Sequence, residues 1–166
     1  CHLGDKDAMT RLRRIRQIDE THHLTLMCRD LSEIATFARV DNAQYRLLKA
    51  LTPGSYPFIL EGTRELPRRL LHPRRKTIGL RVPDHPVAQA LLAELNEPLL
   101  SSTLLLPGDE APLSEATEIR ARLEREVDLI VDAGPCGIDP TTVVDLSGGT
   151  VEILRKGKGS IAPFAH

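Results

Sequence analysis

Short apolar runs that alternate with helix-like stretches are the feature that most limits what this chain can fold into. The runs are rich in Leu, Ile, Val and Thr and are bounded by turn residues, which is typical of β-strands. They lie at 23–27, 56–62, 76–82, 99–106, 127–134, 141–146 and 150–155. The stretches between them do not follow a strict βαβ repeat. We therefore expect an α/β protein of the α+β type, with a twisted mixed sheet and flanking helices.

Helix-capping signals separate several of these runs. An Asp or Ser followed three residues later by an acid or amide is typical of a helix N-terminus, and Pro is favoured in the first turn. The signals are Asp5 or Asp7, Asp30 with Glu33, Asp41 with Gln44, Pro86, and Ser114 with Thr117 or Glu118. A short helical turn is expected near 66–71. Helices therefore begin close to most strand ends.

Length and composition narrow the class of protein. The 166 residues suit a single domain over 1–166, with 41% hydrophobic and 27% charged residues. The first residues, CHLGDKDAM, lack the apolar stretch of a leader, and no run could span a bilayer, so we expect a cytoplasmic protein without a membrane partner. Three widely spaced cysteines without a C-x-x-C pair argue against a disulfide framework and a zinc site, and no bound metal is predicted.

Positive charge is concentrated in three runs although the net charge is −1. The runs lie at 11–16, 68–76 and 155–158. Each run alone is equally well explained as a solvated face. Aromatic residues make up 3% of the chain, which argues against the stacking platforms of single-strand binders.

Hydroxyl residues and arginines recur near strand ends. They are Thr77, Arg81, Ser101, Ser102, Thr103, Thr141, Thr142 and Arg155. A guanidinium offers a fixed fork that matches a carboxylate or phosphate, and hydroxyls donate to the same oxygens. The pattern therefore suits an anionic ligand. Two plainer explanations stay open: Arg81 pairs with Asp84 or another acid, and the threonines Thr141 and Thr142 are present for their β-branching.

The order of six motifs resembles the YrdC/YciO family, in detail its YciO branch. The motifs are R-x-R after an amphipathic helix, TPGSYPFIL, KTIGLRVPDHP, EPLLSSTLLLPG, PTTVVDL and ILRKG. The resemblance implies a YrdC/RibB-like fold with a concave basic cavity. Relative to the family pattern, the chain lacks an N-terminal helix and strand. An uncovered strand invites pairing with another chain, so a homodimer is among the expected assemblies.

The resemblance also implies a chemistry. Characterised relatives are L-threonylcarbamoyladenylate synthases, nucleotidyltransferases that join L-threonine, bicarbonate and ATP for the modification of tRNA. Matched motif by motif, the nucleotide contacts are Arg14, Arg16, Thr77, Thr103 and Arg155, and the L-threonine contacts are Arg81, Ser101 and Thr141. ATP is then a substrate, accompanied by Mg²⁺ on its phosphates. No catalytic base is identified.

A second interpretation remains beside the enzyme. The basic cavity of the family also suits RNA, so the chain is alternatively a module that binds double-stranded RNA or tRNA without catalysis. Binding of a polyanion weakens steeply with salt, whereas compact binding of ATP and L-threonine depends on a few side chains. Salt dependence therefore separates the two interpretations.

Overall fold

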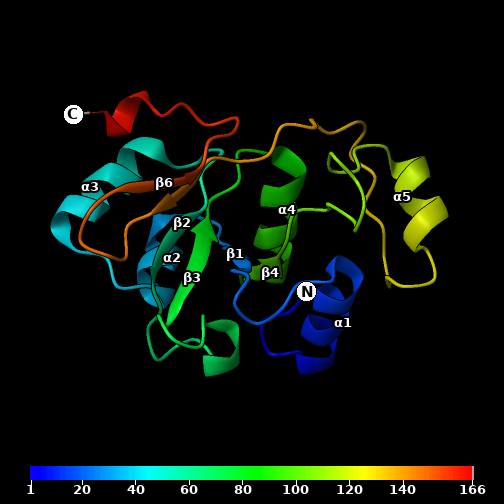
Figure 1. Cartoon of the computed structure of the whole chain (residues 1–166), viewed down its shortest axis with the longest axis horizontal. Helices are drawn as coiled ribbons and strands as arrows, with labels where there is room; N and C mark the ends of the chain where they lie inside the picture. Colours follow the sequence, from blue (N-terminus) through cyan, green and yellow to red (C-terminus); the bar gives the residue numbers. More distant parts are fainter. Residues whose placement is uncertain (166) are drawn as a thin grey trace.

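A six-stranded mixed β-sheet is the centre of the structure, a computed structural model that describes residues 1–165 (Figure 1). Its strands are β1 (Thr25–Met27), β2 (Phe58–Glu61), β3 (Thr77–Arg81), β4 (Leu99–Ser101), β5 (Val143–Asp145) and β6 (Glu152–Arg155). The strand order is β4-β1-β3-β2-β5-β6. β1 is parallel to β3 and β2 is parallel to β5, while the other neighbours are antiparallel. The sheet confirms the predicted mixed α/β architecture.

Helices connect most of the strands. In the described residues they are α1 (Lys6–Arg16), α2 (Leu31–Phe37), α3 (Asn42–Leu51), α4 (Pro86–Leu95) and α5 (Ala116–Leu123), with 3-10 turns η1 (Arg68–Leu70) and η2 (Ala162–Phe164). The side chains of Asp5, Asp30 and Asp41 accept hydrogen bonds from backbone N–H groups in the first turns of α1, α2 and α3, as the spacing predicted. α5 begins later than expected, after Glu115 and without a side-chain cap.

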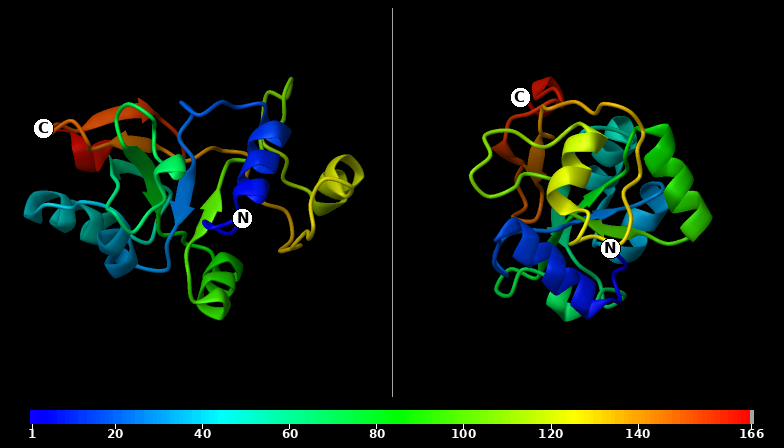
Figure 2. Two further views of the ribbon diagram at one scale, coloured as in Figure 1. Left: turned by 90° about the horizontal axis from the view of Figure 1, so that it is seen from below. Right: turned by 90° about the vertical axis from the view of Figure 1, so that its right-hand side faces the viewer.

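The helices cover the two faces of the sheet unequally. Viewed from below, α2, α3 and α4 lie on one side, and α1 and β6 lie toward the other (Figure 2, left). Side chains of the helix-covered face form the core, among them the fully buried Leu26, Phe58 and Leu80. Ile34 of α2 and Leu48 of α3 pack into the same cluster. Most apolar burial is therefore on one side, which leaves the other face available for polar side chains.

Of the predicted strands, one ends well before its run does and another is absent. The run 99–106 forms a strand only as far as Ser101, and 127–134 forms no strand. Leu129, in the second run, is 77% exposed. An apolar run becomes a strand only where a neighbouring strand accepts its backbone hydrogen bonds, and none lies beside these residues within 1–165.

The outer edge of β4 is covered by the first residues of the chain. The Cys1 amine donates to the Leu100 carbonyl at 2.7 Å, and the Leu100 N–H donates to the Cys1 carbonyl at 2.9 Å. His2 bridges to Leu99. A homodimer stays a prediction.

Within residues 1–165, every helix is too short or too polar to cross a membrane.

Candidate functional site: the open face of the sheet

Alternation along β3 separates the core face of the sheet from an open face. Successive strand residues point to opposite faces. Ile78 and Leu80 are fully buried in the core, so Thr77, Gly79 and Arg81 belong to the opposite face. Two of the predicted site residues, Thr77 and Arg81, therefore share one side of one strand.

The register of β1 and β4 extends the open face to Ser101. Thr25 of β1 lies beside Gly79 of β3 and, on its other side, beside Ser101 of β4. Residues paired across strands point to the same face. The Ser101 hydroxyl donates to the Thr25 carbonyl at 2.9 Å, which leaves its lone pairs open to a donor.

Gly79 keeps the middle of this face flat. A Cβ added there would lie 3.1 Å from the Thr25 hydroxyl oxygen and 3.2 Å from the Leu24 carbonyl oxygen. Any side chain at position 79 would therefore press against β1 and protrude from the open face between Thr77 and Arg81.

A β-bulge turns Arg155 onto the same face. The register between β5 and β6 shifts between Val143 and Val144, so that Val143 pairs with Arg155 instead of Leu154. Because Val144 is a core residue, Val143 and its partner face the open side. The Arg155 guanidinium donates to the Thr141 carbonyl at 2.9 Å and to the Thr141 hydroxyl at 3.0 Å. The bulge thus places Arg155, bonded to Thr141, on the same face of the sheet as Thr77, Arg81 and Ser101.

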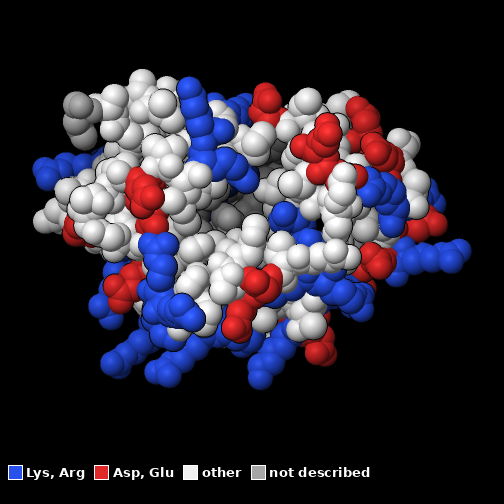
Figure 3. Space-filling model, viewed as in Figure 1, with Lys and Arg blue, Asp and Glu red and all other residues white. Residues whose placement is uncertain are grey.

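The open face is hollowed at its middle. Figure 3 shows a depression beyond the C-terminal end of β3, with Lys and Arg side chains at its rim. Figures 1 and 3 share one view, in which β6 and the C-terminal segment lie on one side of the depression and α1 and β4 on the other. The depression agrees with the concave basic cavity that the resemblance implies.

Arg16 reaches toward this region from the last turn of α1. Its Nε donates to the Leu105 carbonyl at 2.8 Å, and its Nη1 donates to the Ser102 hydroxyl. Burial lowers the pKa of Arg16, and the charge of Arg155 lowers it further, so the two guanidinium groups lie within electrostatic reach. Arg16 and Thr103 also line a cavity of about 320 Å³, which Arg81 and Arg155 do not line.

Arg81 is half-buried and lacks an acidic partner. Its Nε donates to the Gly54 carbonyl at 3.4 Å, a long hydrogen bond, and no carboxylate of residues 1–165 lies within 4 Å. Burial lowers its pKa. The prediction that Arg81 pairs with Asp84 or another acid is therefore wrong. A buried charge without a counter-ion is costly, which is typical of a site that awaits an anion.

Thr77 lies at the other end of β3 and is already engaged. The residue is 2% exposed, and its hydroxyl lies 2.7 Å from Nε2 of His23. His23 stacks on His72 at a centroid distance of 5.3 Å. Burial, followed by the nearby charges of His72 and Arg75, lowers the pKa of His23 to about 4, so the imidazole is neutral near pH 7. A ligand would reach the Thr77 hydroxyl only beside His23.

Arg14 is not brought together with the other predicted residues. Two positions along an α-helix correspond to about 200° of rotation, so Arg14 and Arg16 project in different directions. The Arg14 side chain is exposed, whereas Arg16 is half-buried. The structure therefore pairs Arg16 with Thr103 in one cavity and Arg155 with Thr141 beside the hollow, and it leaves Arg14 apart from both pairs.

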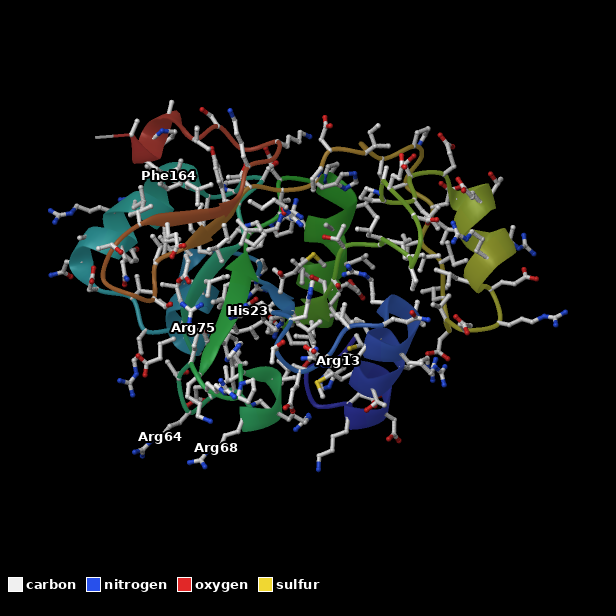
Figure 4. All side chains as sticks on the ribbon, in the orientation of Figure 1. Arg13, His23, Arg64, Arg68, Arg75 and Phe164 are labelled. Atoms are coloured by element: carbon white, nitrogen blue, oxygen red, sulfur yellow. The ribbon has the colours of Figure 1, made fainter. Side chains whose placement is uncertain are left out.

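Sequence reasoning missed a polar cluster at the lower end of β3. Arg75 donates to the Asp145 carboxylate at 2.5 Å and to the Ser147 hydroxyl at 2.7 Å, and in Figure 4 Arg75 and His23 lie beside β3. Burial would raise the pKa of Asp145, but hydrogen bonds from Ser147 and Arg75 outweigh it and hold that pKa below its usual range. Asp145 follows two valines at the end of an apolar strand. A carboxylate in such a place indicates that a cationic partner lies nearby, but the sequence does not identify that partner.

Proteins of known family share this fold. A family model described as Telomere recombination, for Sua5, YciO and YrdC proteins, matches residues 1–157. Uncharacterized YciO of Escherichia coli K12 is 55% identical over 164 residues, which cover 99% of this chain and 80% of that protein. A crystal structure of E. coli YciO matches with a TM-score of 0.96, and the match covers 99% of this chain and 80% of that chain.

More distant relatives carry a functional name. A threonylcarbamoyl-AMP synthase of Chromohalobacter salexigens is 30% identical over 157 residues, which cover 94% of this chain and 83% of that protein. The crystal structure of P. abyssi Sua5 complexed with L-threonine shares the fold, with a TM-score of 0.82 at 21% identity over 92% of this chain and 45% of that chain.

Proposed function

The chain belongs to the Sua5/YciO/YrdC family, and from this premise we propose that its open sheet face binds ATP and L-threonine and forms threonylcarbamoyl-AMP. The observation that carries the proposal is the set of guanidinium groups at the hollow. Arg16, Arg81 and Arg155 have no carboxylate within 4 Å among residues 1–165. ATP and an amino-acid carboxylate supply the missing negative charge.

L-Threonine is assigned to the upper end of β3. The fork of Arg81 matches a carboxylate, with which it forms two parallel hydrogen bonds. The Ser101 hydroxyl, which donates to the Thr25 carbonyl, accepts from the amino group of the substrate. The Thr141 hydroxyl accepts from Arg155 and donates to the substrate hydroxyl.

ATP is assigned to the side of the hollow formed by α1 and β6. Arg16, whose pKa is lowered by burial and by the charge of Arg155, neutralises the phosphates together with Arg155. Thr103 lies beside Arg16 in one cavity, whereas the Thr77 hydroxyl, buried and bonded to His23, would contact ATP only beside that imidazole. Of residues 1–165, no three His, Cys, Asp or Glu side chains form a metal-binding group, and no step is assigned to a metal.

The reaction then needs little covalent chemistry from the protein. The threonine amine adds to bicarbonate and loses water, which gives a carbamate. A carbamate oxygen attacks the α-phosphorus of ATP, the bond to the bridging oxygen breaks, and pyrophosphate leaves with the electron pair. Holding the two anions together against their repulsion is the work of the three arginines.

Calorimetric titration with ATP and with L-threonine tests the proposal. The Arg16→Gln variant should bind ATP roughly tenfold or more weakly, because a hydrogen bond to a charged group contributes about 1.5–3 kcal/mol. Arg14→Gln, on the other side of α1, is the matched control and should bind ATP normally. Pyrophosphate release in the presence of bicarbonate should need both substrates. If the titration with ATP or the titration with L-threonine gave no heat of binding, the proposal would be overturned.

A second candidate function is RNA binding in the hollow without catalysis. The observation that favours it is that the depression opens directly onto the surface between basic side chains (Figure 3). RNA held there should lose affinity steeply with salt, and Arg16→Gln with Arg155→Gln should reduce the slope of log K against log salt by about 2. RNA binding together with silent ATP and L-threonine titrations would favour this candidate over the synthase.

A further inference from the structure

An apolar pair of side chains lies beside Arg81 on the open face. Met27 of β1 is paired with Arg81 of β3 on one side and with Leu99 of β4 on the other. Side chains of residues paired across strands point to the same face of a sheet. Arg81 therefore has Met27 as its neighbour in the row and Leu99 as the next side chain along. We call Met27 and Leu99 the apolar pair.

The apolar pair is separate from the hydrophobic core and is partly open to solvent. Met27 and Leu99 are each half-buried, whereas the residues beside them in the chain, Leu26 and Leu100, are fully buried on the opposite face. The next row on the open face offers hydroxyl groups and a glycine, from Ser101, Thr25 and Gly79. Because Arg81 ends β3, the pair lies at the end of that strand where Figure 3 shows the depression. Apolar surface therefore adjoins the arginine that is assigned to the substrate carboxylate.

Thr141, the assigned partner of the substrate hydroxyl, does not make that hydroxyl necessary. Its own hydroxyl already accepts a hydrogen bond from Arg155 at 3.0 Å, and the residue is half-buried. Water therefore replaces the substrate hydroxyl when a ligand lacks one. A site rejects such a ligand by about 10⁴- to 10⁵-fold where its buried polar groups are left unpaired, and that condition is not met at Thr141.

The balance between a hydroxyl and a methyl group is close at such a site. Loss of one hydrogen bond between neutral groups weakens binding by about 2- to 13-fold. Burial of one further methyl group against the apolar pair strengthens binding by about 4-fold. L-Valine has a methyl group where L-threonine has its hydroxyl, so the two effects nearly cancel.

The proposed reaction also makes no use of the hydroxyl, because the carbamate forms on the amine and one of its oxygens attacks the α-phosphorus. We propose that the amino-acid site accepts short β-branched 2-amino acids as a class, L-valine as well as L-threonine, and that their side chains lie on the apolar pair. This wider substrate class rests on the proposed synthase function, because Arg81 must first hold the carboxylate.

Calorimetric titration of the parent protein with L-threonine, L-valine and glycine tests the proposal, together with pyrophosphate release from ATP in the presence of bicarbonate. The affinity for L-valine should lie within about tenfold of that for L-threonine. Glycine has no side chain to cover the apolar pair, so it should bind at least about tenfold more weakly than L-valine. Pyrophosphate should be released with L-valine as well as with L-threonine.

The Met27→Gln variant tests the role of the apolar pair, since glutamine has a similar length and a polar end. Its affinity for L-valine should fall by about tenfold more than its affinity for L-threonine, whose hydroxyl pairs with the glutamine amide. Leu95→Gln is the matched control, because Leu95 is a 45% exposed residue of α4, on the other side of the sheet. This control should leave the ratio of the two affinities unchanged.

The failures of the two proposals look different in these measurements. If L-threonine binds and is turned over while L-valine binds more than roughly a hundredfold more weakly, the wider substrate class is wrong and the synthase function stands. If none of the amino acids gives heat or releases pyrophosphate, both proposals fall. If Met27→Gln, shown to be folded by thermal unfolding, keeps the parent's ratio of affinities, or if Leu95→Gln changes it equally, the side chain does not lie on the apolar pair. The ratio in the parent protein decides the substrate class even if Met27→Gln fails to fold.

Discussion

Replacing Arg81 with Met should make the protein more stable and weaken its binding of L-threonine. The guanidinium is half-buried, makes one long hydrogen bond to Gly54 and has no carboxylate within 4 Å among residues 1–165. Replacing a buried charge with an apolar side chain of similar volume is neutral or stabilising by about 1–4 kcal/mol even for paired charges. Allowing for the partial exposure of Arg81, we expect a gain of about 1–2 kcal/mol in the free energy of unfolding.

The assay combines thermal unfolding with calorimetry. For a chain of this size, about 1–2 kcal/mol corresponds to a rise of roughly 2 to 8 °C in Tm. Loss of a fork to a carboxylate should weaken L-threonine binding by about 3 kcal/mol, or roughly 150-fold. Arg81→Lys is the control: it keeps the charge and its cost, so its Tm should stay near that of the parent. A lower Tm in Arg81→Met, or unchanged L-threonine affinity, would refute the reasoning.

Three further perturbations follow from the geometry. The pKa of His23 is about 4 in the folded protein against 6.5 unfolded, so the unfolded chain takes up the extra proton first as pH falls. Allowing for the partial exposure of the imidazole, the free energy of unfolding should fall by about 1–2 kcal/mol between pH 6.5 and pH 4. Urea unfolding of His23→Gln should show a flatter dependence on pH. Thr142→Val removes a hydroxyl that donates to the Gly159 carbonyl at 2.6 Å and accepts from the Gly157 N–H at 2.9 Å. The free energy of unfolding, measured in the same assay, should fall by about 1–3 kcal/mol. A smaller loss would mean that water takes over the hydrogen bonds of the hydroxyl. Gly79→Ala should cost about 1–3 kcal/mol and weaken L-threonine binding, and normal affinity in calorimetry would contradict its place on the floor of the site.

Local signals predicted the elements well where the chain's own neighbours decide the conformation. The Asp41 and Gln44 capping box forms as its spacing requires, since both partners lie within one turn. The run 127–134 was predicted as a strand and forms none, because an apolar composition does not supply the neighbouring strand that a ladder needs.

The candidate site was only partly readable in the same way. Alternation in KTIGLRV already separates Thr77 and Arg81 from the core residues Ile78 and Leu80. The engagement of Thr77 with His23, 54 residues away in sequence, has no local signal. The ion pair between Arg75 and Asp145 also joins residues far apart in the sequence, and no local pattern predicts it.

By itself, the sequence determined where most of the helices and strands lie, which side of each strand is apolar, and which family the motif order resembles. All of these depend on residue types at short spacing. Only the tertiary structure decided that the bulge in β6 turns Arg155 to the open face, that Arg16 bonds to Ser102 and Leu105 while Arg14 stays exposed, and that Arg81 has no acidic partner within the described residues. Register between strands and distances between charges are properties of chain segments that meet only after folding, so no local pattern carries them.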